Sequence, residues 1–360
     1  RLSLAGVISH EIGHVTGRHS AKRYTTAVGA NLLGSLLNTL IKNPILQNLT
    51  NTTSSLYLLS YSRKHEYEAD SLATRYMVRA GFEPYEMANF LKQMEKYSKL
   101  QKKIIGDKKK VSELLLTHPN SSKRVVEVIN SVDDSSTYKP IIGREVFLKK
   151  IDGMLYGDKP EEGFFYKNTF IHKPLDFFFN FDESIFFINN PKFLLGLGEN
   201  DTKIFFDIDN NNINHGDLDY FSSWAKIPKK NILDYSKKTI GGFIISECII
   251  KKSDKTIGLA LIKDDKNLYR FSITSEKKYF KSYKKKFSDI VYSFGKVSTN
   301  SRINNIEPPK IRVIKNSSED NFIKEVIKKS SFQKKFSKDI FMTINNVDDI
   351  KTNQKIKTIY

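Results

Sequence analysis

The chain of 360 residues contains a single cysteine, so no disulfide can form within it. Cys248 lies in the apolar run 243–250 without a catalytic partner in view, which favours a small core residue. Acidic residues are also in deficit, since 40 aspartates and glutamates face 59 lysines and arginines and leave a net charge of +19. The 39% of hydrophobic residues can still bury a substantial core, and the length predicts two or three domains.

The sequence also lacks a nucleic-acid-binding motif and a long uninterrupted apolar run. The lysines are dispersed through an Asn-, Ile- and Lys-rich sequence that lacks a nucleic-acid-binding motif, so we exclude nucleic acid. An anionic membrane surface or an acidic wall polymer stays open as a partner of the basic chain. A membrane-spanning helix requires about 18 consecutive apolar residues. Residues 25–60 are largely apolar, but polar residues interrupt every apolar run in them before it reaches this length. They predict two helices broken at Asn43-Pro44.

The motif with the clearest chemistry is His-Glu-x-x-His at residues 10–14. An α-helix advances about 100° per residue, so His10 and His14 project from one face and can bind one metal ion. Imidazole donors favour Zn²⁺, and a catalytic zinc site needs three protein ligands plus an open position for water. Glu11 lies beside them and is suited to take a proton from that water as it attacks a carbonyl.

The same motif also occurs by chance on solvated helical faces. Two features of the flanking sequence favour a buried metal helix instead. The small residues Gly6 and Gly13 would let a second segment approach closely. Apolar residues also precede the motif, at Leu2, Leu4, Val7 and Ile8.

The third zinc ligand must come from elsewhere in the chain. A metzincin pattern, His-Glu-x-x-His-x-x-Gly-x-x-His, fits from His10 through Gly17 but fails at residue 20, which is serine. His19 is out of register, because on a continued helix it would lie roughly opposite His10. We therefore interpret His19 as a residue at the surface or behind the ligands.

A better third ligand lies in residues 62–70, where Glu66 and Asp70 are four residues apart in a run of good helix formers. Glu66 is the predicted ligand. Asp70 would accept the spare ring N–H of a ligating histidine and fix its tautomer. Glu68 points away from this face, and we expect it to be solvated. The Glu-x-x-x-Asp pattern is common on helices and does not indicate a metal site by itself. It indicates one here because it follows the His-Glu-x-x-His motif at this distance.

Together these motifs resemble peptidase family M48, the HtpX- and BepA-like gluzincin zinc proteases. The matching segments stand in the family's order at residues 10–19, 62–70, 81–84 and 117–124, the last reading Thr-His-Pro-x-x-x-x-Arg. The resemblance implies a mainly helical domain with one Zn²⁺ per chain, polypeptide substrates, and a place in the bacterial cell envelope, periplasmic or membrane-associated. Because Arg1 leads directly into the zinc helix, we also expect a targeting segment to be missing at the N-terminus.

Three features of the resemblance leave alternatives open. In the family, the histidine at the position of His118 can reach the metal, so His118 could block the water site or donate to the oxyanion. Arg124 could pair with an active-site carboxylate, stabilise the oxyanion or form a structural salt bridge. Residues 25–60 match a region that covers the cleft in related proteases, which makes them a lid, a membrane-dipping hairpin or a plain helical hairpin.

The middle of the chain predicts a second domain. Residues 131–162 are interpreted as a linker and a connecting helix. Strand-like runs followed by a helical run at 278–292 then predict an α+β domain over residues 163–297, which resembles PsbP. The runs are residues 164–171, 175–181, 193–197, 203–208, 242–250, 256–263 and 267–273.

The end of the chain predicts a third, small domain. After a linker at residues 298–309, residues 310–360 follow the order strand, helix, helix, strand, which resembles a LysM module and implies peptidoglycan as a partner. Ser-Ser-Glu-Asp at residues 317–320 replaces the usual Gly-Asp-Thr turn of LysM modules. This departure counts against peptidoglycan binding even where the fold is kept.

We therefore predict a multidomain protein with a mainly α zinc-peptidase domain at residues 1–130, an α+β domain and a βααβ LysM-like module. The predicted function is zinc-dependent hydrolysis of peptide bonds in unfolded or misassembled envelope proteins. The alternative is a catalytically silent chaperone or wall-binding scaffold whose zinc site His118 closes. The intact Glu11 favours the enzyme, because a binding module needs no base beside its metal. A third hypothesis, an anionic-surface binding protein, predicts salt-sensitive membrane binding that survives loss of the zinc ligands.

Overall fold

The computed structural model describes residues 2–25, 62–105, 122–130, 143–190, 192–210, 216–251, 255–264, 267–317, 321–345 and 352–360. Nearly all of the predicted hairpin at 25–60, and His118, lie outside these residues. The chain divides into two compact units, residues 1–150 and 151–360. Helices and antiparallel sheets both occur in it, so the protein is a multidomain α+β protein. Within the described ranges, every helix is too short or too polar to cross a membrane.

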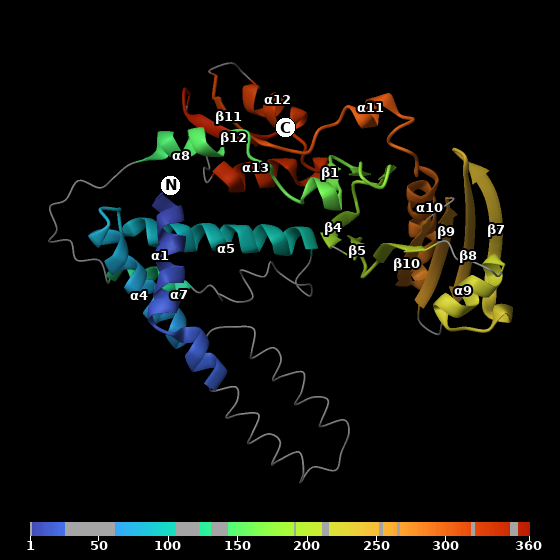
Figure 1. Ribbon diagram of the computed structural model, residues 1–360, viewed down its shortest axis with the longest axis horizontal. Coiled ribbons are helices and arrows are strands. Elements are labelled where there is room, and N and C mark those ends of the chain that lie inside the picture. Colours follow the sequence, from blue (N-terminus) through green and yellow to red (C-terminus); the bar gives the residue numbers. More distant parts are fainter. Residues whose placement is uncertain are drawn as a thin grey trace, which may run out of the picture. The chain divides into compact units, whose positions relative to one another are not determined.

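The first unit is helical (Figure 1). Its helices are α1 (Leu2–Thr16), α4 (Arg63–Arg79), α5 (Tyr85–Ile105), α7 (Ser122–Asn130) and α8 (Arg144–Ile151). Helix α1 packs against α4 and α5, and α7 packs against the same two helices. A core of Ala73, Met77, Met87, Leu91 and Val128 joins them. Burial of these side chains, rather than helical propensity alone, fixes the positions of α1 and α4.

Helix α1 meets its neighbours through its smallest residues. A Cβ atom on Gly13 would lie 2.9 Å from the carbonyl oxygen of Ala69 and 3.1 Å from its Cα, so only glycine fits there. A Cβ atom on Gly6 would meet the flexible side chain of Met87 at 3.3 Å. The expected close approach is present, but Leu4 and Ile8 are 46% and 51% exposed. The buried side of α1 is therefore formed by glycines and histidines, and these two apolar residues stay outside it.

Helix α1 does not continue through His19. It ends at Thr16, and a turn at Gly17 and Arg18 precedes a further helical stretch at residues 19–25. Arg18 has a φ of 53°, in the left-handed region that terminates right-handed helices. The chain changes direction at this residue, so the angular position expected for His19 on an unbroken helix does not apply.

The second unit contains a three-stranded sheet in the order β1-β2-β3 and a seven-stranded sheet in the order β4-β5-β6-β10-β9-β8-β7, both antiparallel (Figure 1). The strands are β1 (Phe164–Tyr166), β2 (Thr169–His172), β3 (Phe177–Asn180), β4 (Phe186–Asn190), β5 (Phe193–Leu197), β6 (Lys203–Asn210), β7 (Ile232–Ile240), β8 (Phe243–Lys251), β9 (Lys255–Lys263) and β10 (Asn267–Glu276). Two helices accompany the larger sheet, α9 (Asp217–Ala225) and α10 (Lys277–Tyr292).

Both faces of the larger sheet are covered. Alternate residues of each strand point to opposite faces, so Ile262 and Phe271 pack with Phe287 of α10. On the other face, Cys248 packs with Phe221 of α9. Cys248 is 2% exposed, and burial raises the pKa of its thiol to about 12, aided by the charge of Glu247. The sole cysteine therefore lies in the core as an unreactive thiol.

Three elements of the seven-stranded sheet and its accompanying helices were not predicted. Strands β4 and β7 are the two edges of the seven-stranded sheet, and α9 is a short helix between β6 and β7. The predicted single run at 164–171 is the hairpin β1–β2, which turns at Lys167 with a φ of 52°. The other strand-like runs and the predicted helix correspond to β3, β5, β6, β8, β9, β10 and α10.

The C-terminal segment follows the predicted order of elements. These are β11 (Ile311–Lys315), α12 (Phe322–Lys329), α13 (Ser337–Asn345) and β12 (Lys355–Ile359). Strand β11 pairs antiparallel with β12, and a core of Val326, Phe332, Phe341 and Ile356 joins the strands to the helices. The short helix α11 (Ser301–Asn304) precedes them. The likeness to a LysM module in particular stays a prediction.

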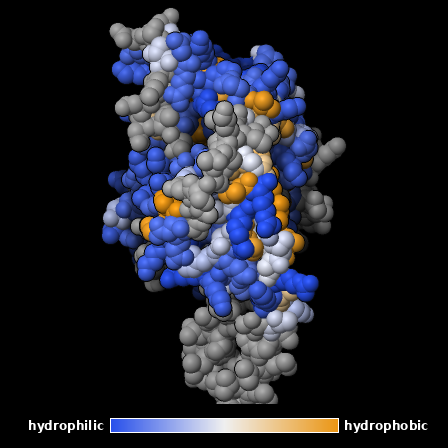
Figure 2. Space-filling model, turned by 90° about the vertical axis from the view of Figure 1, so that its left-hand side faces the viewer, coloured by the Kyte–Doolittle hydropathy of each residue, from blue (hydrophilic) through white to orange (hydrophobic). Residues whose placement is uncertain are grey.

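Hydrophilic residues dominate the face of the molecule drawn in Figure 2, where hydrophobic residues form small separate patches. Such scattered apolar exposure is normal for a folded protein and marks no binding surface by itself.

The glycine contact gives a prediction about stability. We expect Gly13→Ala to lower the free energy of unfolding by about 1–3 kcal/mol, because the new methyl group overlaps the backbone of Ala69. Gly6→Ala is the matched control, since it makes the same change on the same helix against the flexible end of Met87. Alanine favours a helix over glycine by about 1 kcal/mol at either position. Thermal unfolding followed by circular dichroism checks this, and equal melting temperatures for both variants would contradict it.

Candidate metal centre

Three buried side chains from two helices converge in the first unit. His10 and His14 come from α1, and Glu66 comes from the first turn of α4. Their ligand atoms all lie within 4.8 Å of one another. None of the three residues is more than 3% exposed. The structure therefore brings together the three residues that the sequence predicts as metal ligands, although 51 residues separate His14 from Glu66 along the chain.

The donor set suits Zn²⁺. Ligand atoms about 2.1 Å from a tetrahedral zinc ion stand about 3.4 Å apart. The two Nε2 atoms are 3.0 Å apart, and Glu66 places Oε2 3.6 Å from Nε2 of His10 and Oε1 3.3 Å from Nε2 of His14. Two imidazoles and one carboxylate at this spacing leave a fourth tetrahedral position for water.

Local sequence explains why Glu66 faces the histidines. Ser62 caps α4, its hydroxyl accepting a hydrogen bond from the backbone N–H of His65 at 3.2 Å. This cap starts the helix directly before Arg63 and places Glu66 in the first turn, where the helix dipole favours a carboxylate. Four residues on, Asp70 lies on the same face and is 2% exposed.

Asp70 orients His10. Its Oδ1 lies 2.9 Å from Nδ1 of His10, and the negative charge of the carboxylate favours the tautomer with the ring proton on Nδ1. This tautomer leaves the lone pair of Nε2 directed at the converging ligand atoms. Asp70 thus lies where the sequence analysis expects a residue that fixes a ligand tautomer.

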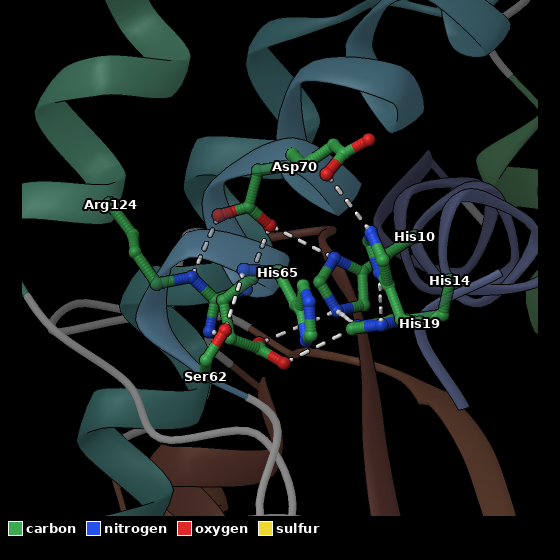
Figure 3. A network of polar contacts seen from close by, with 9 residues as sticks. His10, His14, His19, Ser62, His65, Asp70 and Arg124 are labelled. Atoms are coloured by element: carbon green, nitrogen blue, oxygen red, sulfur yellow. Dashed lines mark hydrogen bonds and ion pairs between the residues drawn. The ribbon is translucent and has the colours of Figure 1, made fainter. Parts of the chain in front are cut away.

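Arg124 of α7 binds both carboxylates of the site (Figure 3). Its Nε and Nη2 each donate to one oxygen of Asp70 at 2.7 Å, and its Nη1 lies 2.8 Å from Oε2 of Glu66. Burial opposes the charge of this 3% exposed residue, but its hydrogen bonds to Asp70 and the negative charges of both carboxylates hold the pKa of Arg124 above the usual value. Of the alternatives for Arg124, the structure places it with the carboxylates.

The remaining predicted residues are placed as follows. Glu11 is exposed on α1, one position after His10. Because it is accessible while its neighbour is buried, Glu11 can reach a water molecule or a substrate that approaches the ligands. His118, the candidate regulatory or oxyanion residue, lies outside the described residues.

His19 is a functional candidate whose position the sequence analysis missed. It is fully buried, and its Nδ1 lies 2.9 Å from Nδ1 of His14 (Figure 3). The turn at Gly17 and Arg18 brings it back to the ligand instead of carrying it round to the far face. Burial lowers the pKa of His19 and outweighs the interaction with the carboxylate of Glu68, which raises it. Gly17, a helix breaker two residues before it, was the one sequence signal for this arrangement.

Comparison with known proteins identifies the helical region. Residues 2–131 match the family model described as Peptidase family M48. This region belongs to the M48 zinc metallopeptidases. The M48 region thus includes the three candidate ligands, Glu11, Asp70 and Arg124.

Two curated relatives illustrate how far the similarity extends. The β-barrel assembly-enhancing protease of Yersinia pestis is 28% identical over 157 residues, which cover 41% of this chain and 31% of the relative. The mitochondrial metalloendopeptidase OMA1 of Arabidopsis thaliana is 35% identical over 122 residues, which cover 34% of this chain and 22% of the relative. The chain therefore spans less than a third of the length of either relative.

Among solved structures, cyanobacterial PsbP from Synechocystis sp. PCC 6803 aligns with 38% of this chain and 96% of its own. The TM-score is 0.29 at 10% sequence identity, and overlap at this level supports no conclusion about the fold. A PsbP-like domain over residues 163–297 therefore stays a prediction.

The Arg124 contacts give a second prediction. We expect Arg124→Met to cost about 3–5 kcal/mol of unfolding free energy in the M48 region, because it leaves Asp70 and Glu66 buried beside each other without a cation. The control Arg144→Met removes an exposed cation that lies 3.9 Å from the exposed carboxylate of Glu145, and it should cost less than about 1 kcal/mol. Denaturant unfolding of both variants checks the difference, and equal costs would rule out a strongly coupled buried network.

Proposed function

We propose that the chain is a zinc-dependent endopeptidase that hydrolyses peptide bonds with its M48 region. The convergence of His10, His14 and Glu66 at the donor spacing of tetrahedral zinc carries this proposal. Glu11 supports it, since an exposed carboxylate next to buried ligands is the arrangement that base catalysis needs.

Each residue of the site has a distinct task. His10, His14 and Glu66 would hold one Zn²⁺, which when bound polarises a substrate carbonyl and lowers the pKa of water. Glu11 accepts a proton at its carboxylate from the attacking water and returns it to the departing amine. Asp70 keeps the proton of His10 on Nδ1, which leaves Nε2 available as a ligand.

Arg124 sets the charge of the site. Glu66 and Asp70 together carry two negative charges, which alone would cancel those of a divalent ion. The guanidinium contacts both carboxylates and offsets one of their two negative charges. In a buried site this would leave more of the charge of a divalent ion to stabilise the negative charge that develops on a carbonyl oxygen during hydrolysis. Arg124 thus acts on the reaction through the carboxylates it binds.

We further propose that the substrates are unfolded or misassembled proteins of the bacterial cell envelope, with the enzyme periplasmic or membrane-associated. The name of the Yersinia relative, β-barrel assembly-enhancing protease, supports this substrate class. The α+β domain over residues 163–297 and the LysM-like module over residues 310–360 would serve as recognition or scaffold modules. The element order of β11, α12, α13 and β12 supports the LysM-like assignment.

Cleavage of an unfolded protein tests the proposal. We expect the zinc-loaded full-length chain to cut casein, a chelator to stop the cleavage, and added zinc to restore it. Glu11→Gln should retain one zinc ion per chain and lose about 100-fold or more in rate, because the base is gone while the ligands remain. Glu95→Gln is the control, since it neutralises a carboxylate of α5 that pairs only with exposed Lys99.

Inactive wild-type protein would be tested again as His118→Ala. Activity in that variant would support a peptidase that His118 inhibits. Silence in both proteins, with zinc bound, would overturn the proposal in favour of the silent scaffold.

A further inference from the structure

A second chain of polar contacts leads from the metal centre to the protein surface. Nδ1 of His14 lies 2.9 Å from Nδ1 of His19, and Nε2 of His19 lies 3.3 Å from Oε2 of Glu68 (Figure 3). His19 is fully buried, whereas the side chain of Glu68 is 41% exposed. Lys22 lies 3.8 Å from the same carboxylate oxygen. Glu68 is therefore not simply solvated, as the sequence suggested, but ends a path that starts at a ligand.

The surrounding structure holds the ring of His19 in place. A Cβ atom on Gly17 would lie 2.5 Å from its Nε2, so residue 17 must be glycine for the ring to occupy this position. The ring of His65 stacks on it, with centroids 4.6 Å apart and an angle of 15° between the planes. The left-handed Arg18 directs the backbone so that this position is reached.

One placement of protons satisfies every contact in the path. With a metal ion held by His10, His14 and Glu66, Nε2 of His14 would direct its lone pair at the ion, and its ring proton would then lie on Nδ1. His14 then donates from Nδ1 to Nδ1 of His19. His19 in turn carries its proton on Nε2, which lies 3.3 Å from Oε2 of Glu68. The carboxylate thereby fixes the tautomer of His19, and His19 fixes that of His14.

We propose that His19 is a positioning residue for the metal, which with Glu68 holds His14 so that Nε2 points at the ion. The arrangement parallels that of His10, whose Nδ1 is held by Asp70. Hydrogen bonds of this kind orient the ring of a ligand and raise its basicity, and losing one typically weakens metal binding by 10–100-fold. The inference rests on the proposed zinc site.

Zinc affinity of the full-length protein, measured by competition with a chromophoric chelator, tests the inference without any activity assay. His19→Phe keeps a ring of similar size but cannot accept a hydrogen bond, and we expect it to weaken zinc binding by about 10–100-fold. His19→Asn places an acceptor oxygen close to the position of Nδ1, and it should recover most of that loss. His65→Phe is the matched control, because it keeps the stacking on His19 and should bind zinc like wild type.

The Co²⁺-substituted protein gives an independent readout. Its visible spectrum reports ligand geometry, and we expect His19→Phe to shift it while His19→Asn leaves it close to that of wild type. Glu68→Ala provides a variant that does not disturb the core, since its side chain is partly exposed. Water can replace part of the carboxylate's role, so we expect a smaller, several-fold loss of zinc affinity there.

The outcomes separate this inference from the function it rests on. Equal zinc affinity in wild type, His19→Phe and Glu68→Ala would overturn the positioning role and leave the zinc site standing. Equal losses in His19→Phe and His19→Asn would also overturn it, because the effect would then not depend on the hydrogen bond. Wild-type protein that binds no zinc would instead refute the proposed function itself.

Discussion

The M48 region depends on one steric constraint, the contact between Gly13 and the backbone of Ala69. With no Cβ on residue 13, helices α1 and α4 approach closely enough for side chains from both to share a buried space. The histidines on either side of this contact then reach Glu66 and Asp70, which lie on either side of Ala69. The candidate ligands can therefore meet only because the two helices pack closely. The absence of a Cβ atom on Gly13 allows the faces of α1 and α4 to form one site.

Burying so many ionisable groups is tolerable only because each has a partner of complementary charge or hydrogen-bonding type. Asp70 contacts both the ring of His10 and the guanidinium of Arg124. The same guanidinium also contacts the carboxylate of Glu66. On the other side, His14 continues through His19 to Glu68 at the surface. A complete network of this kind stabilises the folded state by more than the sum of its pairwise interactions. Removal of one member destabilises the fold, because the remaining charged or polar groups stay buried without a partner.

Sequence reasoning worked where a short-range period determines the geometry. The spacing of His10 and His14, and of Glu66 and Asp70, follows from the helical repeat, and the buried strands of the seven-stranded sheet follow from their apolar runs. It failed to predict the direction of the His19 side chain, which was calculated for an unbroken helix. The left-handed residue Arg18 turns the chain before His19 and directs this side chain toward His14. It also failed at β4 and β7, the two edges of the sheet, where partial exposure removes the apolar signal. Pairing with a neighbour, which no local pattern reports, defines those strands.

The ligands come from helices that are distant in sequence, and this has a consequence for folding. An ion held by His14 and Glu66 closes a loop of 51 intervening residues, as a cross-link would. Since the unfolded chain has no such preformed site, the free energy of metal binding adds to the free energy of folding. The zinc supply of the compartment would then regulate how much of the protein is folded, and with it how long the chain survives other proteases.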